Sequence, residues 1–464
     1  MADLGMTGPE TRHLANLCSW AAGLDIGALP GPVVAQAVNV LSDDIAAIVS
    51  ACGDPALKAV RELALLSGGR AEASVFDGTG RRTDRYTAAL VNGAAAPWNE
   101  LDEGSRRVPC HAGIYAIPAL LAEAEAEGIG TQEVLRALVV AYETVTRVAL
   151  AFPQTDLKLH PHAAYAAIGA AAAVAAARRF DAARFCNALT IAATLVNPGP
   201  FDHAVRGSLA RNMWVGHAAW TGLRAADWSA SGIAGLADGL HDVFCGMFGC
   251  CLAPDQLSAG LGTSWLILQN FQKIYPCCQY AHSTIEAMAD LMAGLPPPLA
   301  PGEATEIAVD IHPKGLKLNQ YDPPTMLSAR FSVPHIAAVM AARGRIDSET
   351  LAPGSLADPV VAMLRRRVVL RPYSPDLPPP DDRAARVTLK FEDGREFTAE
   401  CLCARGSPSK PLGQEAIRRK IAAICTPVYP ELPAVFARMA RLEEAALQAP
   451  WRDLIAGSIS QRTR

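Results

Sequence analysis

The spacing of apolar residues changes along this chain of 464 residues, and that change constrains the fold more than any other feature. From about residue 10 to about residue 230, apolar residues recur at spacings of three and four, which is typical of helices with one buried face. After about residue 265 they alternate, as in half-buried strands. The sequence therefore predicts a mainly α protein, with a large all-helical domain and a smaller α+β lid domain.

The helical part contains four clear helices. They are expected at residues 131–152, 162–180, 181–194 and 215–227, with Asp181 as the N-cap of the third. The Ala-rich run at 163–177 is apolar enough to suggest a membrane span, but alanine contributes little transfer free energy, and histidines and arginines flank the run. A helix buried in a large bundle is the better interpretation, so no membrane association is expected.

The second part of the chain has a mixed pattern of strand and helix spacings. Residues 305–312 alternate like a strand, 333–343 have helical spacing, and 385–400 predict a hairpin around Asp393-Gly394. Proline-rich segments at 295–301 and 377–382 are predicted to be surface connectors, and helical spacing returns at 413–447. We predict one discontinuous helical domain from residues 1–265 and 405–464, and a lid domain from 266–404.

Composition excludes several classes of protein. Half of the residues are apolar, and 42 basic residues against 46 acidic ones leave no basic surplus, so nucleic acid is not an expected partner. The N-terminus lacks a basic start followed by an apolar core, so a cytoplasmic location is expected. The twelve cysteines form no CxxC and no HExxH is present, so we predict no metal site and reduced, buried thiols.

Residues 91–119 carry an unusually dense polar run between two apolar helical segments. The run contains Glu100, Asp102, Glu103, Arg106, Arg107 and His111. Charged residues seldom line a core unless they are paired or functional. Carboxylates, guanidinium groups and an imidazole at this density suit proton transfer on a carboxylated substrate.

Several segments together resemble the MmgE/PrpD family, whose members include 2-methylcitrate dehydratases, cis-aconitate decarboxylases and iminodisuccinate epimerases. The similar segments are ALVNG (89–93), HAG (111–113), AYETVTR (141–147), LHPHA (159–163), GHAAWTGLRAA (216–226), FQKIYPCCQYAHST (271–284), ARFSVPHIAA (329–338) and SKPL (409–412). No single motif is diagnostic, but their order and spacing along nearly the whole chain are specific.

The resemblance implies a two-domain homodimer that acts without a metal or organic cofactor on small di- or tricarboxylates in a cleft between the domains. Carried over by position, the cleft would hold Glu100, His111, His160, Arg211, Lys273, Cys278 and His282. Three departures from the family pattern are Gly104 in place of a hydroxyl residue, Arg211 in place of a lysine, and Cys278 in place of a histidine. Cysteine cannot replace that histidine as a proton donor near neutral pH.

Each candidate has an ordinary alternative. His111 or His160 is the expected base, although a single histidine is more often structural. His162 either shares the cleft or caps the helix that follows.

The cationic candidates are Arg211 and Lys273. Arg211 is expected to hold a carboxylate with two hydrogen bonds, with a surface ion pair as the alternative. Lys273 is expected to be partly buried, with a lowered pKa, and to act as base or anion clamp; otherwise its ammonium lies in water. Tyr142 is a second-tier catalytic acid that is more often a core residue.

The predicted reaction begins with removal of a proton from the carbon next to a carboxylate. Loss of a β-hydroxyl would then make the enzyme a hydro-lyase acting on an acid such as 2-methylcitrate, which is our first choice. Reprotonation on the opposite face would make it an epimerase of an iminodisuccinate-like acid, and decarboxylation of a cis-aconitate-like acid ranks third. A catalytically inactive relative that binds small acids is the alternative outside enzymology.

Overall fold

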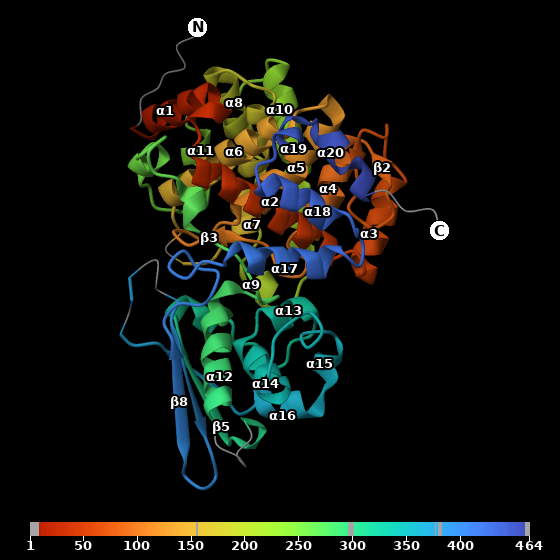
Figure 1. The fold of residues 1–464 in the computed structure, drawn as a ribbon. Coiled ribbons are helices and arrows are strands. Elements are labelled where there is room, and N and C mark those ends of the chain that lie inside the picture. Colours follow the sequence, from red (N-terminus) through yellow and green to blue (C-terminus); the bar gives the residue numbers. More distant parts are fainter. Residues whose placement is uncertain (1–8, 155, 296–300, 376, 379–382, 460–464) are drawn as a thin grey trace.

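Two bodies, one helical and one containing a sheet, are stacked along the long axis of the molecule (Figure 1). The computed structural model describes residues 9–154, 156–295, 301–375, 377–378 and 383–459. Each body has its own cluster of buried apolar side chains, and the cluster of the helical body is much the larger. The predicted mainly helical fold with a smaller α+β part is confirmed.

The helical body is built from the first half of the chain. Its helices are α1 (Pro9–Gly23), α2 (Gly31–Ser50), α3 (Pro55–Leu65), α4 (Arg85–Ala95), α5 (Ala112–Glu127), α6 (Thr131–Ala151), α7 (Pro161–Ala177), α8 (Ala182–Ala193), α9 (Asp202–Val205), α10 (Ala210–Ala230) and α11 (Gly239–His241). Two short antiparallel pairs accompany them, β1 (Ala73–Ser74) with β2 (Arg82–Thr83) and β3 (Gly104–Ser105) with β4 (Asn270–Phe271).

Helix α7 is the centre of this body, because all of its residues are buried. Helices α5, α6, α8 and α10 pack around it. Small side chains allow the close approach: a Cβ on Gly222 of α10 would lie 2.3 Å from the Cβ of Ala170 in α7. The Ala-rich run is therefore a core helix, as its composition predicted. Helix α2 is long and apolar enough to cross a membrane, but 78% of its most apolar window is buried inside the protein.

The α+β body is a four-stranded mixed sheet with helices on one face. Its strands are β5 (Glu306–Ile311), β6 (Val368–Pro372), β7 (Ala385–Lys390) and β8 (Glu396–Cys401), in the order β6-β5-β7-β8. Strand β6 is parallel to β5, and the other pairs are antiparallel. The helices are α12 (His282–Gly294), α13 (Met326–Arg330), α14 (Val333–Arg343), α15 (Gly354–Ala357) and α16 (Pro359–Arg365).

The predicted hairpin at 385–400 is confirmed as β7 and β8, and Gly394 has the positive φ of 83° that its turn requires. Burial alternates along β7, because Ala385, Val387 and Leu389 face the helices while the residues between them are half-exposed. The proline-rich segments predicted as connectors lie largely outside the described residues.

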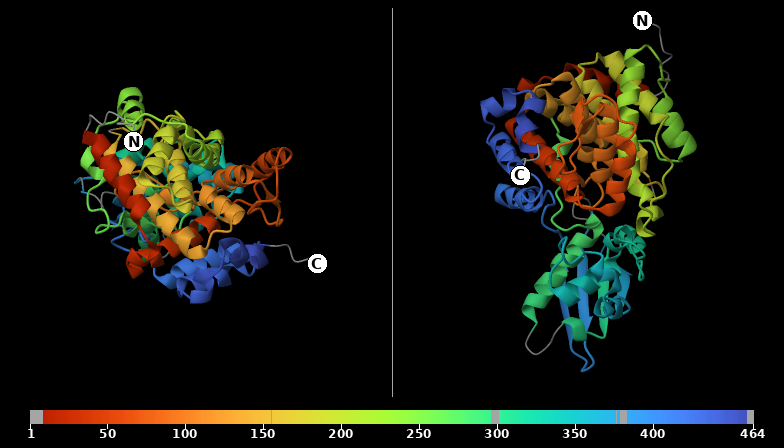
Figure 2. Two further views of the ribbon diagram at one scale, coloured as in Figure 1. Left: turned by 90° about the horizontal axis from the view of Figure 1, so that it is seen from above. Right: turned by 90° about the vertical axis from the view of Figure 1, so that its right-hand side faces the viewer.

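The end of the chain returns to the helical body. Helices α17 (Gln414–Cys425), α18 (Leu432–Ala440), α19 (Glu444–Gln448) and α20 (Trp451–Ile459) contribute buried side chains to its core. Figure 2 shows these helices along one side of the helical body, and in Figure 1 helix α17 lies at the junction with the α+β body.

Of two predicted helix starts, the structure confirms one and moves the other. Asp181 caps α8 by accepting a hydrogen bond from the backbone N–H of Arg184, as predicted. Helix α10 begins five residues earlier than the predicted residue 215, which places Arg211 in its first turn. The apolar spacing missed this turn because its polar residues Arg211 and Asn212 are buried by contacts within the site.

Candidate active site

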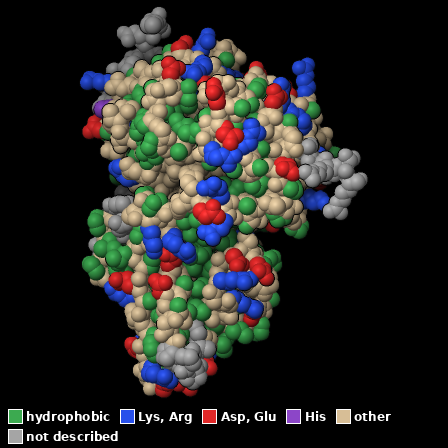
Figure 3. All heavy atoms as spheres, in the orientation of Figure 1, with side chains coloured by type: hydrophobic (Ala, Val, Ile, Leu, Met, Phe, Trp, Pro, Cys, Tyr) green, Lys and Arg blue, Asp and Glu red, His purple; other side chains and the backbone are tan. Residues whose placement is uncertain are grey.

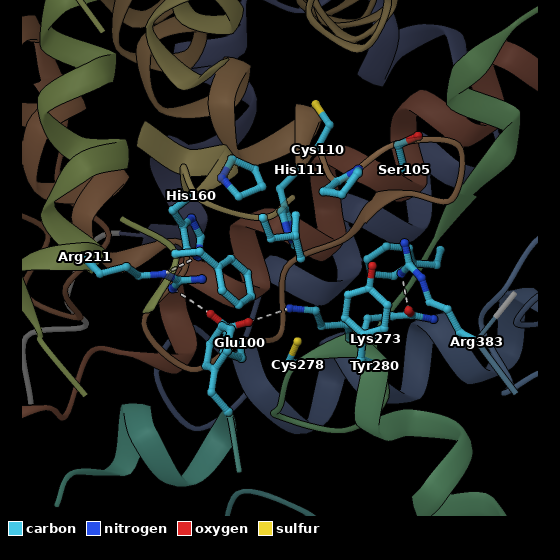
Figure 4. Close-up of a pocket in the computed structure, with 17 residues that line it drawn as sticks. Glu100, Ser105, Cys110, His111, His160, Arg211, Lys273, Cys278, Tyr280 and Arg383 are labelled. Atoms are coloured by element: carbon cyan, nitrogen blue, oxygen red, sulfur yellow. Dashed lines mark hydrogen bonds and ion pairs between the residues drawn. The ribbon is translucent and has the colours of Figure 1, made fainter. Parts of the chain in front are cut away.

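A polar pocket lies where the two bodies meet, and residues of both bodies line it (Figure 4). Its lining residues include Glu100, Cys110, His111, His160, Arg211, Phe271, Lys273, Cys278, Gln279, Tyr280, Phe331 and Arg383. On the face of the molecule shown in Figure 3, Lys and Arg side chains are frequent around the junction of the two bodies. A cleft rich in cations attracts small anions.

A short strand pair brings two distant segments of the site together. Gly104 in β3 pairs with Phe271 in β4, so the loop that carries His111 lies beside the loop that carries Lys273. A Cβ on Gly104 would lie 2.7 Å from the Phe271 ring and 3.0 Å from the carbonyl oxygen of Cys110. Glycine at position 104 is thus explained by the ring that packs against it.

The imidazole of His111 is oriented by a buried carboxylate. Its Nδ1 lies 2.7 Å from Oδ2 of Asp102 and 2.8 Å from the carbonyl oxygen of Glu103. Both neighbours are acceptors, so Nδ1 carries the hydrogen and Nε2 of the neutral ring holds the lone pair. Burial alone would raise the pKa of Asp102, but Lys273 and His111 outweigh it and hold that pKa below its ordinary value. His111 is therefore oriented with Nε2 available to accept a proton.

Glu103 and Tyr142 form a buried layer behind His111. Burial raises the pKa of Glu103 to about 7, although three donors contact its carboxylate. One of them is the Tyr142 hydroxyl, 2.8 Å from Oε2. Burial also raises the pKa of Tyr142 well above its usual value. Tyr142 has no exposed surface and does not line the pocket, so it is not in position to be the catalytic acid that the sequence suggested.

His160 is the N-cap of α7, and its ring lines the pocket. The backbone N–H of His162 donates to Nδ1 at 3.1 Å, and Nε of Arg211 lies 3.2 Å from Nε2. Donors thus face both ring nitrogens, and burial followed by the Arg211 charge lowers the pKa of His160 far below its usual value. Of the two candidate bases, His160 is therefore the one that does not readily accept a proton, and the geometry favours His111.

His162 is neither a cap nor a pocket residue. Its Nδ1 lies 2.9 Å from the Tyr115 hydroxyl, and the side chain is completely buried. Its ring packs edge-on against both His111 and His160, with centroids 4.9 and 4.5 Å away. The capping role left open for His162 belongs to His160, because the residue before Pro161 has the extended backbone of an N-cap.

Glu100 bridges the two cations that were expected to hold substrate. Its Oε1 lies 2.6 Å from Nη1 of Arg211, and its Oε2 lies 3.0 Å from Nζ of Lys273. All three side chains are at most 2% exposed. The backbone of Glu100 has φ 54°, a left-handed conformation that costs free energy for a residue other than glycine and is often found at functional sites. The carboxylate that Arg211 and Lys273 hold here is thus the protein's own.

The pKa predicted for Lys273 was in the wrong direction. Burial alone would lower the pKa of its ammonium, but the carboxylates of Asp102 and Glu100 outweigh burial and raise it. Nζ also lies 3.3 Å from Oδ1 of Asp102. Lys273 therefore remains charged at neutral pH and cannot be the base. The ammonium can act on a nearby anion through its charge.

Cys278 and His282 differ in position. Cys278 lines the pocket, and burial raises the pKa of its thiol to about 11, so the thiol stays protonated. His282 is 1% exposed in the first turn of α12 and does not line the pocket. Burial, followed by the Lys273 charge, lowers the pKa of His282 to about 3. The structure therefore brings Glu100, His111, His160, Arg211, Lys273 and Cys278 together and leaves His282 behind them.

Sequence reasoning missed Arg383 and Gln279. Arg383 precedes β7, and its guanidinium reaches the pocket from the α+β body, where Nη1 donates to Oε1 of Gln279. Gln279 lies inside the segment 271–284 but was not singled out there, and a single arginine after a proline-rich segment gave no signal. Among the described residues, no group of three His, Cys, Asp or Glu side chains is placed to hold a metal ion.

Comparison with known proteins gives matches across both bodies. The MmgE/PrpD N-terminal domain matches residues 15–259, and the MmgE/PrpD C-terminal domain matches residues 275–444. The cis-aconitate decarboxylase-like protein oryM of Aspergillus oryzae is 24% identical in an alignment of 482 positions that covers 95% of each chain. Cis-aconitate decarboxylase of Aspergillus terreus is 27% identical over 61% of this chain and 60% of its own. The Mus musculus cis-aconitate decarboxylase is 23% identical over 92% and 90%.

Proposed function

This chain belongs to the MmgE/PrpD family, and from that premise we propose that it is a cofactor-independent lyase that acts on a small di- or tricarboxylate. The observation that carries the proposal is the contact between His111 and the Asp102 carboxylate at the edge of a cation-rich pocket. A proton next to a carboxylate is weakly acidic. Its removal requires a base at contact distance and cations that stabilise the negative charge as it develops.

In the proposed reaction, Nε2 of His111 takes the proton from the carbon next to a substrate carboxylate. Asp102 stabilises the imidazolium that forms, as a carboxylate does in a catalytic triad. The positive charges of Lys273 and Arg211 stabilise the electron pair that spreads onto the carboxylate. Hydroxide then leaves the neighbouring carbon and takes up a proton to become water, which makes the protein a hydro-lyase for an acid such as 2-methylcitrate.

Decarboxylation of a cis-aconitate-like acid is the second candidate, because the relatives described above are named for that reaction. The two reactions differ in the first step. Decarboxylation of an unsaturated acid needs a proton donor at the double bond, whereas water elimination needs an acceptor at the α-carbon, and the contacts of Nδ1 of His111 leave Nε2 for that role. The orientation of His111 therefore favours water elimination.

Exchange in deuterated water tests the proposal. The protein is incubated separately with 2-methylcitrate, citrate, cis-aconitate and iminodisuccinate, and NMR follows deuterium at the α-carbon, water loss and release of carbon dioxide. We expect exchange accompanied by an unsaturated product. Release of carbon dioxide without water loss would favour the decarboxylase, and exchange with inversion would favour an epimerase. If no acid shows any of these changes, the proposal of a lyase is wrong.

A matched pair of variants tests the base. His111→Asn is expected to lower the exchange rate by about 100-fold or more, because general base catalysis contributes about that much. His203→Asn is the control, since His203 on α9 stacks on Trp214 and does not line the pocket. The control is expected to exchange within about threefold of the wild-type rate. Equal rates in the two variants would exclude His111 as the base.

A further inference from the structure

Two guanidinium groups from different bodies of the molecule face one neutral oxygen atom. Nη1 of Arg106, in the loop before α5, lies 3.2 Å from Oε1 of Gln279. Nη1 of Arg383, which precedes β7, donates to the same oxygen. An amide oxygen carries only a partial charge, whereas a carboxylate oxygen in the same place would form two charge-assisted hydrogen bonds. The arrangement thus favours an anionic group beside Gln279.

Arg383 is buried but incompletely bonded. The residue is 7% exposed, and its Nε has no hydrogen-bond partner within the described part of the chain. Its guanidinium carbon lies 4.7 Å from the ring centroid of Tyr280 and 5.5 Å from that of Phe271, so two aromatic rings hold the planar group. A buried donor without a partner costs free energy that a bound ligand can recover.

The charges of the pocket are balanced at one end and not at the other. Glu100 forms ion pairs with both Arg211 and Lys273. No carboxylate of the described residues forms an ion pair with Arg383. In Figure 4, Arg383 and Arg211 lie at opposite ends of the pocket. A ligand carboxylate can therefore bind at Arg383 without displacing Glu100 from its two cations.

We propose that Arg383 and Gln279 form a second carboxylate subsite, with Arg106 adding positive charge behind them. The subsite binds the carboxylate that is farther from the carbon that loses its proton. This inference rests on the proposed function and deepens it, because it limits substrates to acids with at least two separated carboxylates. It also assigns part of the specificity to a side chain of the α+β body, so that bound substrate contacts both bodies.

Binding of an unreactive triacid tests the subsite separately from catalysis. The probes are tricarballylate, which has neither a hydroxyl to lose nor a double bond, and its terminal monoamide, each measured by calorimetry. We expect the wild type to bind tricarballylate at least about tenfold more tightly than the amide. Arg383→Gln should weaken tricarballylate binding by about 10- to 100-fold and change amide binding by less than about threefold.

Two further variants sharpen the comparison. Gln279→Glu places a carboxylate between Arg106 and Arg383, and it is expected to weaken tricarballylate binding by about tenfold or more through competition for the two cations. Arg386→Gln is the control, because Arg386 lies on the half-exposed face of β7 and pairs with Glu400. The control should bind both probes as the wild type does. If Arg383→Gln does not fold, Arg383→Lys is used in the same comparison.

The possible failures are distinguishable. If Arg383→Gln or Arg383→Lys and Gln279→Glu bind both probes with wild-type affinity, the subsite is overturned even where deuterium exchange shows an active lyase. The Arg383 and Gln279 variants could instead lose affinity for tricarballylate alone while no acid shows exchange in the wild type. In that case the subsite stands and the lyase proposal fails. Equal loss of both probes would also overturn the subsite, since it would indicate a general disturbance of the pocket.

Discussion

His111, His160, His162 and His282 lie in or behind the same pocket, yet their surroundings give them different chemical properties. Of these four, His111 is the one whose ring contacts a carboxylate. Burial lowers the pKa of each of the other three. A neutral imidazole in a buried site can orient or donate but accepts a proton only at a cost. At the scale of single residues, contacts rather than residue type separate the candidate base from its neighbours.

His282 gives a prediction about pH. Its pKa is lowered to about 3 by burial, so the unfolded chain binds a proton between pH 3 and its usual pKa of about 6.5 and the folded chain does not. The stability that this residue contributes is therefore complete above about pH 6.5 and is lost as the pH falls, by up to about 1.4 kcal/mol per pH unit.

We expect His282→Gln to remove this slope. Urea unfolding of the wild type and the variant is measured at pH 8, 6.5, 5.5 and 5, with the difference at pH 8 as the reference because both side chains are uncharged there. The free energy of unfolding should fall more steeply with acid in the wild type. Parallel curves would mean that His282 titrates alike in the folded and unfolded chains.

Helices α7 and α10 place His160 and Arg211 beside each other, because both residues lie at helix N-termini and the two helices pack closely along their length. The close packing of α10 against its neighbours depends on two glycines in α10. A Cβ on Gly222 would lie 2.6 Å from the backbone nitrogen of Ala171, and one on Gly216 would lie 2.3 Å from the carbonyl oxygen of Leu90 in α4. Backbone atoms cannot move aside as a flexible side chain can.

At the scale of elements, we therefore predict that Gly222→Ala lowers the free energy of unfolding by about 1–3 kcal/mol and also reduces activity, since α10 must shift and carry Arg211 with it. The matched control is Gly457→Ala in α20, where an added Cβ meets no atom within 4 Å among the described residues outside its own stretch of helix. The control should gain up to about 1 kcal/mol from higher helix propensity. Chemical unfolding and initial rates check both variants, and an unchanged Gly222→Ala protein would contradict the packing argument.

At the level of the whole molecule, the C-terminal helix α17 packs against the first half of the chain and contacts α2. Nζ of Lys420 in α17 lies 2.7 Å from Oδ1 of Asp43 in α2 and donates to the carbonyl oxygen of Leu101 at 2.9 Å. Leu101 lies between Glu100 and Asp102, so the C-terminal helices support the loop that carries the site. Burial raises the pKa of Asp43, and the Lys420 charge opposes that rise.

Removal of one partner from this buried pair is expected to be costly. Lys420→Met should lower the free energy of unfolding by about 3–5 kcal/mol, because it leaves the Asp43 carboxylate buried without its cation. Adding Asp43→Asn to Lys420→Met should recover part of that loss. A double-mutant cycle in urea measures the coupling free energy. Additive effects of the two substitutions would show that the pair does not act as a unit.

Most elements of this fold follow from local patterns, whereas most properties of the site do not. The period of the apolar residues predicted helix α6, helix α14 and the β7–β8 hairpin, and the side chain at Asp181 predicted a cap, because each depends on residues a few positions apart. Family motifs indicated six residues of the pocket. They did not indicate Arg383, and they placed His282 in a site that its side chain does not reach, as was also true of the second-tier candidate Tyr142.

The amino-acid sequence by itself determined the helical and strand periods, the turn at Gly394 and the set of ionisable groups available for chemistry. Only the tertiary structure decided that Glu100 forms ion pairs with both Arg211 and Lys273. It also decided that Asp102 contacts the ring of His111, and that the ammonium of Lys273 remains charged. The physical reason is that burial and charge act through space. Glu100 and Lys273 are 173 positions apart in the chain, yet their charged atoms lie 3.0 Å from each other.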